Sequence, residues 1–276
     1  MKSELESLER RIRFCGHGAM VCVIIAAILV VLCMARAARA QDVLLPCYEP
    51  VVGQLALAQV PKGKESRLWL LLNVNSGPSV KRDKAYGALV SSARQRGVKL
   101  AFYIELMGGG DYSPVIVKNG DAWKLITSPV ARLKSALELK TERDAWRVMY
   151  EAPGAWFIDD VPGKLSPELI NELSGWGPRL ILNPGCSWSP PPLLVSAVVV
   201  ISEQAKAWPR TLSSWEAAHR DQCAVMGLSL NSQSLPAFMA STRGMAFRYA
   251  SPLDDQWRAG KSAYTTLPSY FTQLFP

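Results

Sequence analysis

The sequence predicts a (β/α)8 barrel behind an N-terminal leader, and three observations support this fold class. Eight short apolar runs follow the leader, and each ends in polar or turn residues. Several runs are unbroken, such as residues 68–72 and 197–201, which is typical of parallel strands covered on both faces. Helical patterns separate most of the runs, which favours a closed barrel, with a doubly wound open sheet as the alternative. The expected strands are residues 43–48, 67–73, 99–105, 155–159, 179–183, 196–202, 224–230 and 246–249.

The expected helices are marked by their ends. Residues 84–96 stop at Gly97 and residues 234–243 stop at Gly244, the position where glycine commonly ends a helix. Ser166 followed by Pro167 predicts a capped helix start. Residues 127–150 carry apolar side chains at roughly helical spacing and are expected to form two helices, whereas the proline-rich residues 184–194 are too few for a full helix.

The N-terminus predicts export. Residues 19–34 are unbroken apolar, behind a polar leader that contains Arg10, Arg11 and Arg13, and Ala38-Arg39-Ala40 offers a cleavage site after Ala40. The apolar run is near the lower limit for crossing a bilayer, so an uncleaved membrane anchor through residues 19–34 is the other interpretation. The predicted parts are therefore a signal peptide or anchor, 1–40, and a barrel, 41–276. The barrel would be secreted, periplasmic or at the cell surface.

The composition of residues 41–276 argues against a nucleic-acid partner and against a disulfide framework. Removing 40 of 276 residues leaves 236, with 25 Lys and Arg against 20 Asp and Glu, a net charge of +5. The sequence contains no basic run with interleaved aromatic residues, so no nucleic-acid groove is predicted. Cys47, Cys186 and Cys223 are odd in number and lack metal-type spacing, so we expect core residues or free thiols.

One stretch, Gly154-Ala-Trp-Phe-Ile-Asp-Asp-Val-Pro162, predicts the position of a site. An apolar run directly precedes Asp159 and Asp160, and Pro162 has no N–H to donate to a neighbouring strand. Parallel strands carry ligands at their carboxyl ends, and neighbouring side chains point to opposite faces. We therefore expect at most one of the two carboxylates to aim fully into a site. A solvated turn is the alternative interpretation.

The other strand ends carry a similar set of side chains. Carboxylates, amides and tyrosines at one rim are typical of carbohydrate sites, because they hydrogen-bond hydroxyl groups and stack on sugar rings; simple solvation of the rim is the alternative. Trp188 is expected to be either a stacking platform or a packing residue. The candidate residues at or beyond the strand ends are Tyr48, Glu49, Asn73, Asn75, Tyr103, Glu105, Tyr112, Asp159, Asp160, Asn183, Glu203, Asp254 and Asp255.

Other chemistries lack the residues that they need. His219 is the single histidine after the leader, whereas zinc hydrolases use two or more imidazoles and a catalytic triad needs a suitably placed base. We expect His219 at the surface. Gly108-Gly109-Gly110 lacks a following Lys-Ser/Thr, so it is not a phosphate-binding loop and is expected to form a flexible lip above the site. No metal or cofactor is predicted.

Five segments together resemble the spherulation-specific family 4 (spherulin-4-like) proteins, which are related to endo-α-1,4-galactosaminidase-type glycoside hydrolases. They are Asn73-Val-Asn-Ser-Gly-Pro78, Gly97-Val-Lys-Leu-Ala-Phe-Tyr103, Trp156-Phe-Ile-Asp-Asp160, Leu182-Asn-Pro-Gly185 and the strand that ends in Glu203. They occur in the family's order and cover most of residues 43–255. Asp160 stands where the family usually has Glu, and Glu105 and Met107 replace its usual residues. Tyr48, between Cys47 and Glu49, does not fit its first-strand pattern cleanly.

The resemblance implies a (β/α)8 barrel that cleaves α-linked galactosamine or N-acetylgalactosamine polymers. It implies Asp159 as nucleophile and Glu203 as general acid/base, with Asp160 beside them. We expect Tyr48, Asn73, Tyr103, Tyr112, Asn183 and Asp254 to bind substrate. The change from Glu to Asp at Asp160 motivates a second hypothesis, a carbohydrate-binding envelope protein on the same barrel that has lost the chemistry.

Overall fold

The computed structural model describes most of the chain after residue 40. Its described residues are 41–74, 76–108, 115–120, 122–126, 132–177, 179–186, 188–203, 210–253 and 263–275. The chain divides into two units, residues 1–40 and 41–276. In the part of the chain that the structure describes, no helix is both long and apolar enough to cross a membrane.

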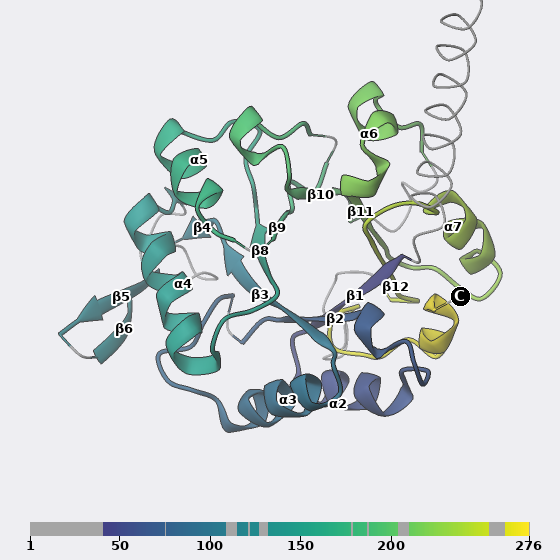
Figure 1. Cartoon of the computed structure of the whole chain (residues 1–276), viewed down its shortest axis with the longest axis horizontal. Coiled ribbons are helices and arrows are strands. Elements are labelled where there is room, and N and C mark those ends of the chain that lie inside the picture. Colours follow the sequence, from purple (N-terminus) through teal and green to yellow (C-terminus); the bar gives the residue numbers. More distant parts are fainter. Residues whose placement is uncertain are drawn as a thin grey trace, which may run out of the picture. The chain divides into compact units, whose positions relative to one another are not determined.

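The described residues of the second unit form a closed barrel of eight parallel strands (Figure 1). Around the barrel the order is β1-β12-β11-β10-β9-β8-β3-β2, and β1 pairs with both β12 and β2. This closure confirms the predicted (β/α)8 fold and shows that the open-sheet alternative is wrong. The barrel strands are β1 (Asp42–Cys47), β2 (Leu68–Leu72), β3 (Lys99–Glu105), β8 (Ala155–Asp159), β9 (Leu180–Leu182), β10 (Val198–Ser202), β11 (Cys223–Gly227) and β12 (Phe247–Ala250).

Helices ring these strands in Figure 1. They are α2 (Pro50–Gln59), α3 (Lys84–Gln95), α4 (Ala136–Tyr150), α5 (Pro167–Ser174), α6 (Ser214–Ala218) and α7 (Leu235–Ser241). The predicted helix starting at Pro167 is confirmed, with Ser166 accepting from the Leu169 N–H. Among the described residues between β9 and β10, the only helical element is a short 3-10 turn, Pro192–Leu194, in agreement with the proline-rich sequence there.

The prediction of two helices over residues 127–150 is wrong. Arg132 and Leu133 form strand β7, which pairs with β4 (Met107–Gly108), and one helix begins at Ala136. A capping box explains this start, because the Ser135 side chain accepts from the Glu138 N–H while the Glu138 carboxylate accepts from the Ser135 N–H. The antiparallel pair β5 (Val115–Asn119) and β6 (Ala122–Ile126) also lies between β3 and α4 and was not expected. Residues 127–131 lie outside the described residues.

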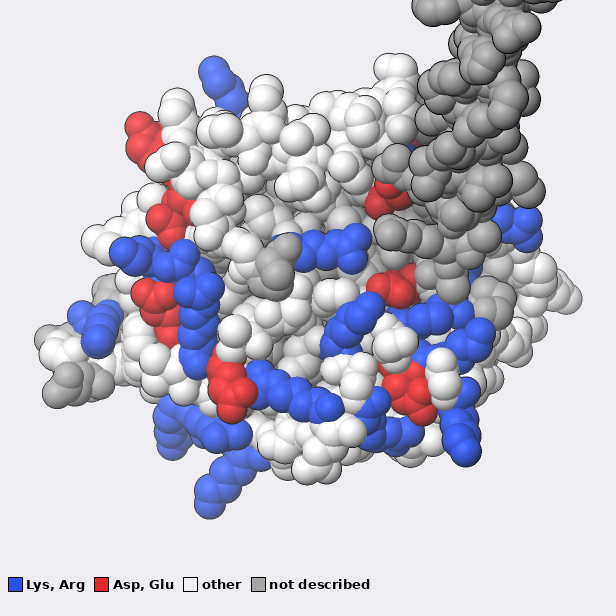
Figure 2. Space-filling view, in the orientation of Figure 1, with Lys and Arg blue, Asp and Glu red and all other residues white. Residues whose placement is uncertain are grey.

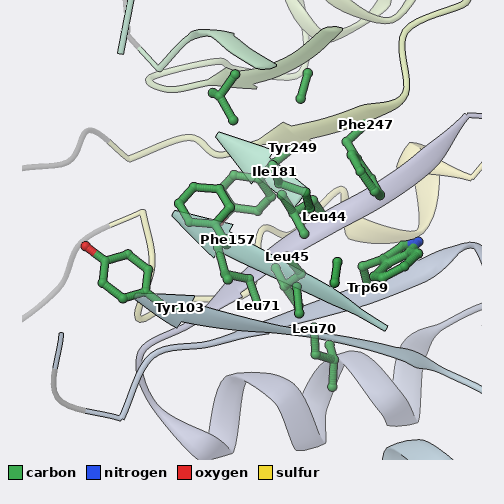
Figure 3. Packing of buried hydrophobic residues seen from close by; sticks show 14 of the residues in the cluster. Leu44, Leu45, Trp69, Leu70, Leu71, Tyr103, Phe157, Ile181, Phe247 and Tyr249 are labelled. Carbon is green, nitrogen blue, oxygen red and sulfur yellow. The ribbon is translucent and has the colours of Figure 1, made fainter. Parts of the chain in front are cut away.

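The barrel interior is filled by large side chains that alternate along the strands. Figure 3 shows Tyr103 at one end of this cluster, Phe157 and Ile181 along it, and Trp69 and Phe247 at the other end. The Tyr103 and Phe157 rings stack with centroids 5.8 Å apart. Residues two positions further along a strand face the same side, so Asp159 follows Phe157, and Asn183 follows Ile181, at the carboxyl end of the barrel. The packed core therefore supports a polar layer above it.

The three cysteines of this unit are free, as predicted. Cys47 and Cys223 are buried, and Cys186 is exposed. Burial raises the pKa of the Cys47 thiol and raises that of Cys223 to about 12, so both are inert core residues.

Candidate active site

Asp159 and Glu203 come together at the carboxyl end of the barrel. Asp159 closes β8, and Glu203 directly follows β10, whose register with β11 shifts between Val200 and Ser202. Such irregularities commonly re-aim side chains beside active sites. Asn183, which directly follows β9, lies between the two carboxylates in the barrel order.

The Asn183 amide bridges the two carboxylates. Its Nδ2 donates to Oδ1 of Asp159 over 2.7 Å and to Oε2 of Glu203 over 2.5 Å. Two oxygens that contact one nitrogen at 2.7 and 2.5 Å can lie at most 5.2 Å apart. Asn183 is itself buried, with 3% of its surface exposed, and its Oδ1 accepts from the Gly185 N–H. The contact with Gly185 fixes the orientation of the amide, with Nδ2 towards the carboxylates.

Asp159 is half-buried and accepts hydrogen bonds from three donors. Oδ2 accepts from the Tyr103 hydroxyl at 2.6 Å, and Oδ1 accepts from Asn183 and from the Asp160 N–H. Burial and then the neighbouring Glu203 charge raise the pKa of Asp159 to about 7, against the lowering effect of the Tyr103 and Asp160 hydrogen bonds. The two carboxyls therefore titrate as a coupled pair, and the raised pKa keeps Asp159 largely protonated below about pH 7.

Three tyrosines surround the pair. Tyr103 donates to Asp159, and Tyr264 donates to Oε1 of Glu203 at 2.5 Å. The Tyr48 ring lies between them, with its centroid 6.1 Å from that of Tyr103 and 5.1 Å from that of Tyr264. Burial raises the Tyr48 pKa, while hydrogen bonds with the Asn73 and Tyr103 side chains lower it. The network therefore runs from Asn73 on the β2 side to Tyr264.

The predicted site residues differ in where the structure places them. Tyr48, Asn73, Tyr103, Asp159, Asn183 and Glu203 form the network described above. Asp160 is exposed, with φ of 53°, and its backbone N–H donates to Oδ1 of Asp159 in the network. This agrees with the expectation that only one of the adjacent aspartates aims fully into the site. Tyr112 and Asp254 lie outside the described residues, as do Asn75, Gly109, Gly110 and Asp255.

Trp188 and His219 are packing residues rather than members of this network. The Trp188 indole N–H donates to the Gly163 carbonyl at 3.2 Å, which ties the β9 loop to the β8 loop. His219 is half-buried at the end of α6, where its ring stacks on Trp215, so the expectation of a plain surface residue is only partly met. Among the described residues, no three His, Cys, Asp or Glu side chains are grouped to hold a metal ion.

Tyr264 is the site residue that the sequence did not predict. It lies in residues 263–275, beyond β12, and no apolar run immediately precedes it. The only available signal was its type, a tyrosine in a C-terminal segment rich in aromatic residues. Its position depends on long-range packing that a search of strand ends cannot detect.

Comparisons with known proteins add the following. No family model matches the sequence, and no curated protein matches it. Solved structures similar to this chain include a mutant of the O-GlcNAc hydrolase of Thermobaculum terrenum (12% identity, 79% of this chain and 56% of that one, TM-score 0.42). A mutant of the atrazine chlorohydrolase TrzN from Arthrobacter aurescens TC1 also matches (14% identity, 73% of this chain and 43% of that one, TM-score 0.31). A third is an α-amylase from Lactobacillus plantarum (13% identity, 74% of this chain and 55% of that one, TM-score 0.30).

This chain thus spans 43–56% of the length of those structures. Similarity at this level carries no argument about activity. The barrel assignment rests on the strand order and on the parallel pairing of all eight barrel strands among the described residues.

Proposed function

We propose that this protein is an exported glycoside hydrolase that uses Asp159 and Glu203 as a pair of catalytic carboxyls. The observation that carries the proposal is the bridge through Asn183, which keeps the nearest oxygens of the two groups within 5.2 Å of each other. Carboxyls about 5–5.5 Å apart suit a retaining mechanism, whereas an inverting enzyme leaves room for a water at roughly 6.5–9.5 Å. The geometry therefore favours retention.

The mechanism has two balanced steps. In the first, the Asp159 carboxylate attacks the anomeric carbon, the glycosidic C–O bond breaks, and Glu203 gives its proton to the leaving oxygen. In the second, water attacks the same carbon, Glu203 takes a proton from that water, and Asp159 leaves as carboxylate. Glu203 must be protonated and Asp159 ionised at the start, so in this mechanism the proton that the coupled pair keeps below about pH 7 resides on Glu203.

The neighbouring side chains have supporting roles in this proposal. Tyr103 and Asn183 orient the Asp159 carboxylate. Tyr48 and Asn73 line the β1–β2 side, where they can hydrogen-bond hydroxyl groups of the sugar. We also assign substrate contacts to Asp160, at the exposed rim, and to Tyr112 and Asp254.

We propose an amino-sugar polysaccharide, α-1,4-linked galactosamine or N-acetylgalactosamine, as the substrate. The resemblance to the spherulin-4-like proteins supports this choice. A second support is the charge at the carboxyl end of the barrel, where Glu105, Asp159, Asp160 and Glu203 lie within or directly after β3, β8 and β10. Carboxylates there would attract free amines of a deacetylated polymer.

Export through residues 1–40 belongs to the same proposal, because a polysaccharide of this kind lies outside the cell. Residues 19–34 are either removed with the leader or anchor the barrel at a membrane surface. Mass spectrometry of the native protein distinguishes a mature chain that starts at Gln41 from one that retains the leader.

The test is reducing-end release from acetylated and deacetylated α-1,4-galactosamine polymers by purified residues 41–276. Asp159→Asn and Glu203→Gln should each lower the rate by at least about 1,000-fold, because each removes a group required in both steps. Glu168→Gln, an exposed change on α5, is the matched control and should retain the full rate. Equal rates in all four proteins would contradict the proposal. Binding without release would favour the carbohydrate-binding alternative.

A further inference from the structure

Tyr264 reaches the site from the C-terminal segment, residues 263–275. Its own carbonyl accepts from the Tyr48 N–H at 3.3 Å, and the carbonyl of the preceding Ala263 accepts from the Tyr249 hydroxyl. Further along, Phe271 and Leu274 are completely buried. These contacts anchor the segment to β12 and to the end of β1, so Tyr264 is placed by packed structure.

Tyr264 and Asn183 occupy both oxygens of Glu203. The Tyr264 hydroxyl donates to Oε1 and the Asn183 amide donates to Oε2. The two donors come from different parts of the chain, which fixes the plane of the carboxyl as well as its position. Tyr264 has 7% of its surface exposed, so little water competes for Oε1.

We propose that Tyr264 is a positioning residue that holds Oε1 of Glu203 and sets when this carboxyl carries its proton. The role rests on the proposed function only in naming Glu203 as the acid/base, since the contact itself is independent of the reaction. Among the described residues, the groups that face Glu203 include Asp159 from β8, Tyr48 beyond β1, Tyr264 and the neutral Asn183.

A hydrogen bond donated to a carboxylate favours its ionised form. Glu203 is ionised after it has given its proton to the leaving group, and it must then accept a proton from water. Tyr264 stabilises Glu203 at this stage. Burial, and then the Glu203 charge, raise the pKa of Tyr264, so the phenol keeps its proton and stays a donor throughout.

The experiment compares Tyr264→Phe with Tyr270→Phe in residues 41–276, a unit that contains the whole closed barrel. Tyr270 lies in the same segment and is equally buried, but its hydroxyl donates to the Leu230 carbonyl at 2.8 Å, away from the carboxylates. The pKa of Glu203 is measured by carboxyl 13C NMR, with its signal assigned by Glu203→Gln. Tyr264→Phe should raise this pKa by about 0.5–1 unit, and Tyr270→Phe should leave it unchanged.

A pKa that does not move in Tyr264→Phe, or that moves equally in Tyr270→Phe, would overturn the role of Tyr264. The kinetic readout is separate. In an active enzyme, Tyr264→Phe should move the alkaline limb of the pH–rate profile upward by the same amount and lower kcat about tenfold with little change in KM. If the wild type is inactive but the Glu203 pKa shifts in Tyr264→Phe, the hydrolase proposal is contradicted and the role of Tyr264 is supported. If the wild type is active but neither the pH–rate profile nor the Glu203 pKa shifts in Tyr264→Phe, the hydrolase proposal is supported and the role of Tyr264 is contradicted.

Discussion

At the residue scale, burial of Asp159 works against stability. Its pKa is raised from an ordinary value of 3.8 to about 7 by burial and by Glu203. Between these pH values the folded protein holds a proton that the unfolded chain has lost, so the free energy of unfolding falls as pH rises from about 4 to about 7. Above that range an ionised, buried Asp159 stands beside Glu203. The site therefore lowers the free energy of unfolding at neutral and alkaline pH.

Asp159→Asn should raise stability while it abolishes hydrolysis. The neutral amide removes the buried charge, so we expect a gain on the order of 1–3 kcal/mol at pH 8 that shrinks towards pH 4, where wild-type Asp159 is protonated. Thermal unfolding at both pH values measures this. Asp160→Asn, at the exposed neighbouring position, is the control and should change stability little. A variant that is less stable than the wild type at pH 8 would show that the Asp159 hydrogen bonds outweigh its desolvation.

Glu203→Gln should lower the pKa of Asp159. Glu203 is the largest charge effect on that carboxyl, and the amide removes it while keeping a similar shape. We expect the pKa to fall from about 7 towards the usual range, and carboxyl 13C NMR follows it directly. An Asp159 pKa that stays near 7 in Glu203→Gln would mean that burial alone sets it, and the two groups would then not act as a coupled pair.

At the element scale, α2 and α3 touch through Gly53. A Cβ at this position would lie 2.5 Å from Cδ2 of Leu89, which is completely buried in α3. Gly53→Ala should therefore destabilise the protein by about 1–3 kcal/mol. Gly87→Ala in α3 is the matched control, because its Cβ would meet the end of the exposed Arg82 side chain, which can move away. Chemical denaturation should show Gly87→Ala as neutral or slightly stabilising; equal losses would contradict the close approach of α2 to α3.

A buried ion pair joins the connection between β7 and α4 to the body of α4. Nζ of Lys134 and Oε1 of Glu142 lie 2.7 Å apart, with 0% and 1% of the two side chains exposed. Burial raises the pKa of Glu142 to about 7 against the opposing effect of Lys134. Glu142→Leu alone should cost about 3–5 kcal/mol because it leaves a buried charge unpaired, whereas Lys134→Met with Glu142→Leu should be neutral or stabilising. Calorimetry of both variants tests this. Equal free energies of unfolding for the single and the double variant would contradict the claim that Lys134 and Glu142 form a buried pair.

Elements with a regular pattern of apolar residues could be predicted from the sequence, and elements without one could not. Unbroken apolar runs located the barrel strands to within a few residues, and strand-end polarity located six of the seven described members of the hydrogen-bonded network. The helix α2 was missed because its apolar residues are spread around it, with Val51 and Leu55 exposed. Tyr264 was missed because only tertiary packing of residues 263–275 brings it to Glu203.

At the scale of the whole molecule, charge is unevenly distributed. Residues 61–99 contain nine Lys and Arg and two Asp and Glu, a net charge of +7, although residues 41–276 together carry +5. In Figure 2 the basic side chains gather over the lower part of the view, where α2 and α3 lie. The positive charge of this protein therefore belongs mainly to the β2–α3 side. The remaining residues of the barrel unit are slightly acidic, which is compatible with a cationic substrate at Asp159 and Glu203.

The most direct test of the central claim is the anomeric configuration of the first product, followed by 1H NMR during cleavage of an α-1,4-galactosamine oligomer. A carboxyl pair bridged by one amide predicts that the α-anomer appears first and then equilibrates, and that Glu203→Gln gives no product. Initial release of the β-anomer, or release that does not depend on Glu203, would contradict the account.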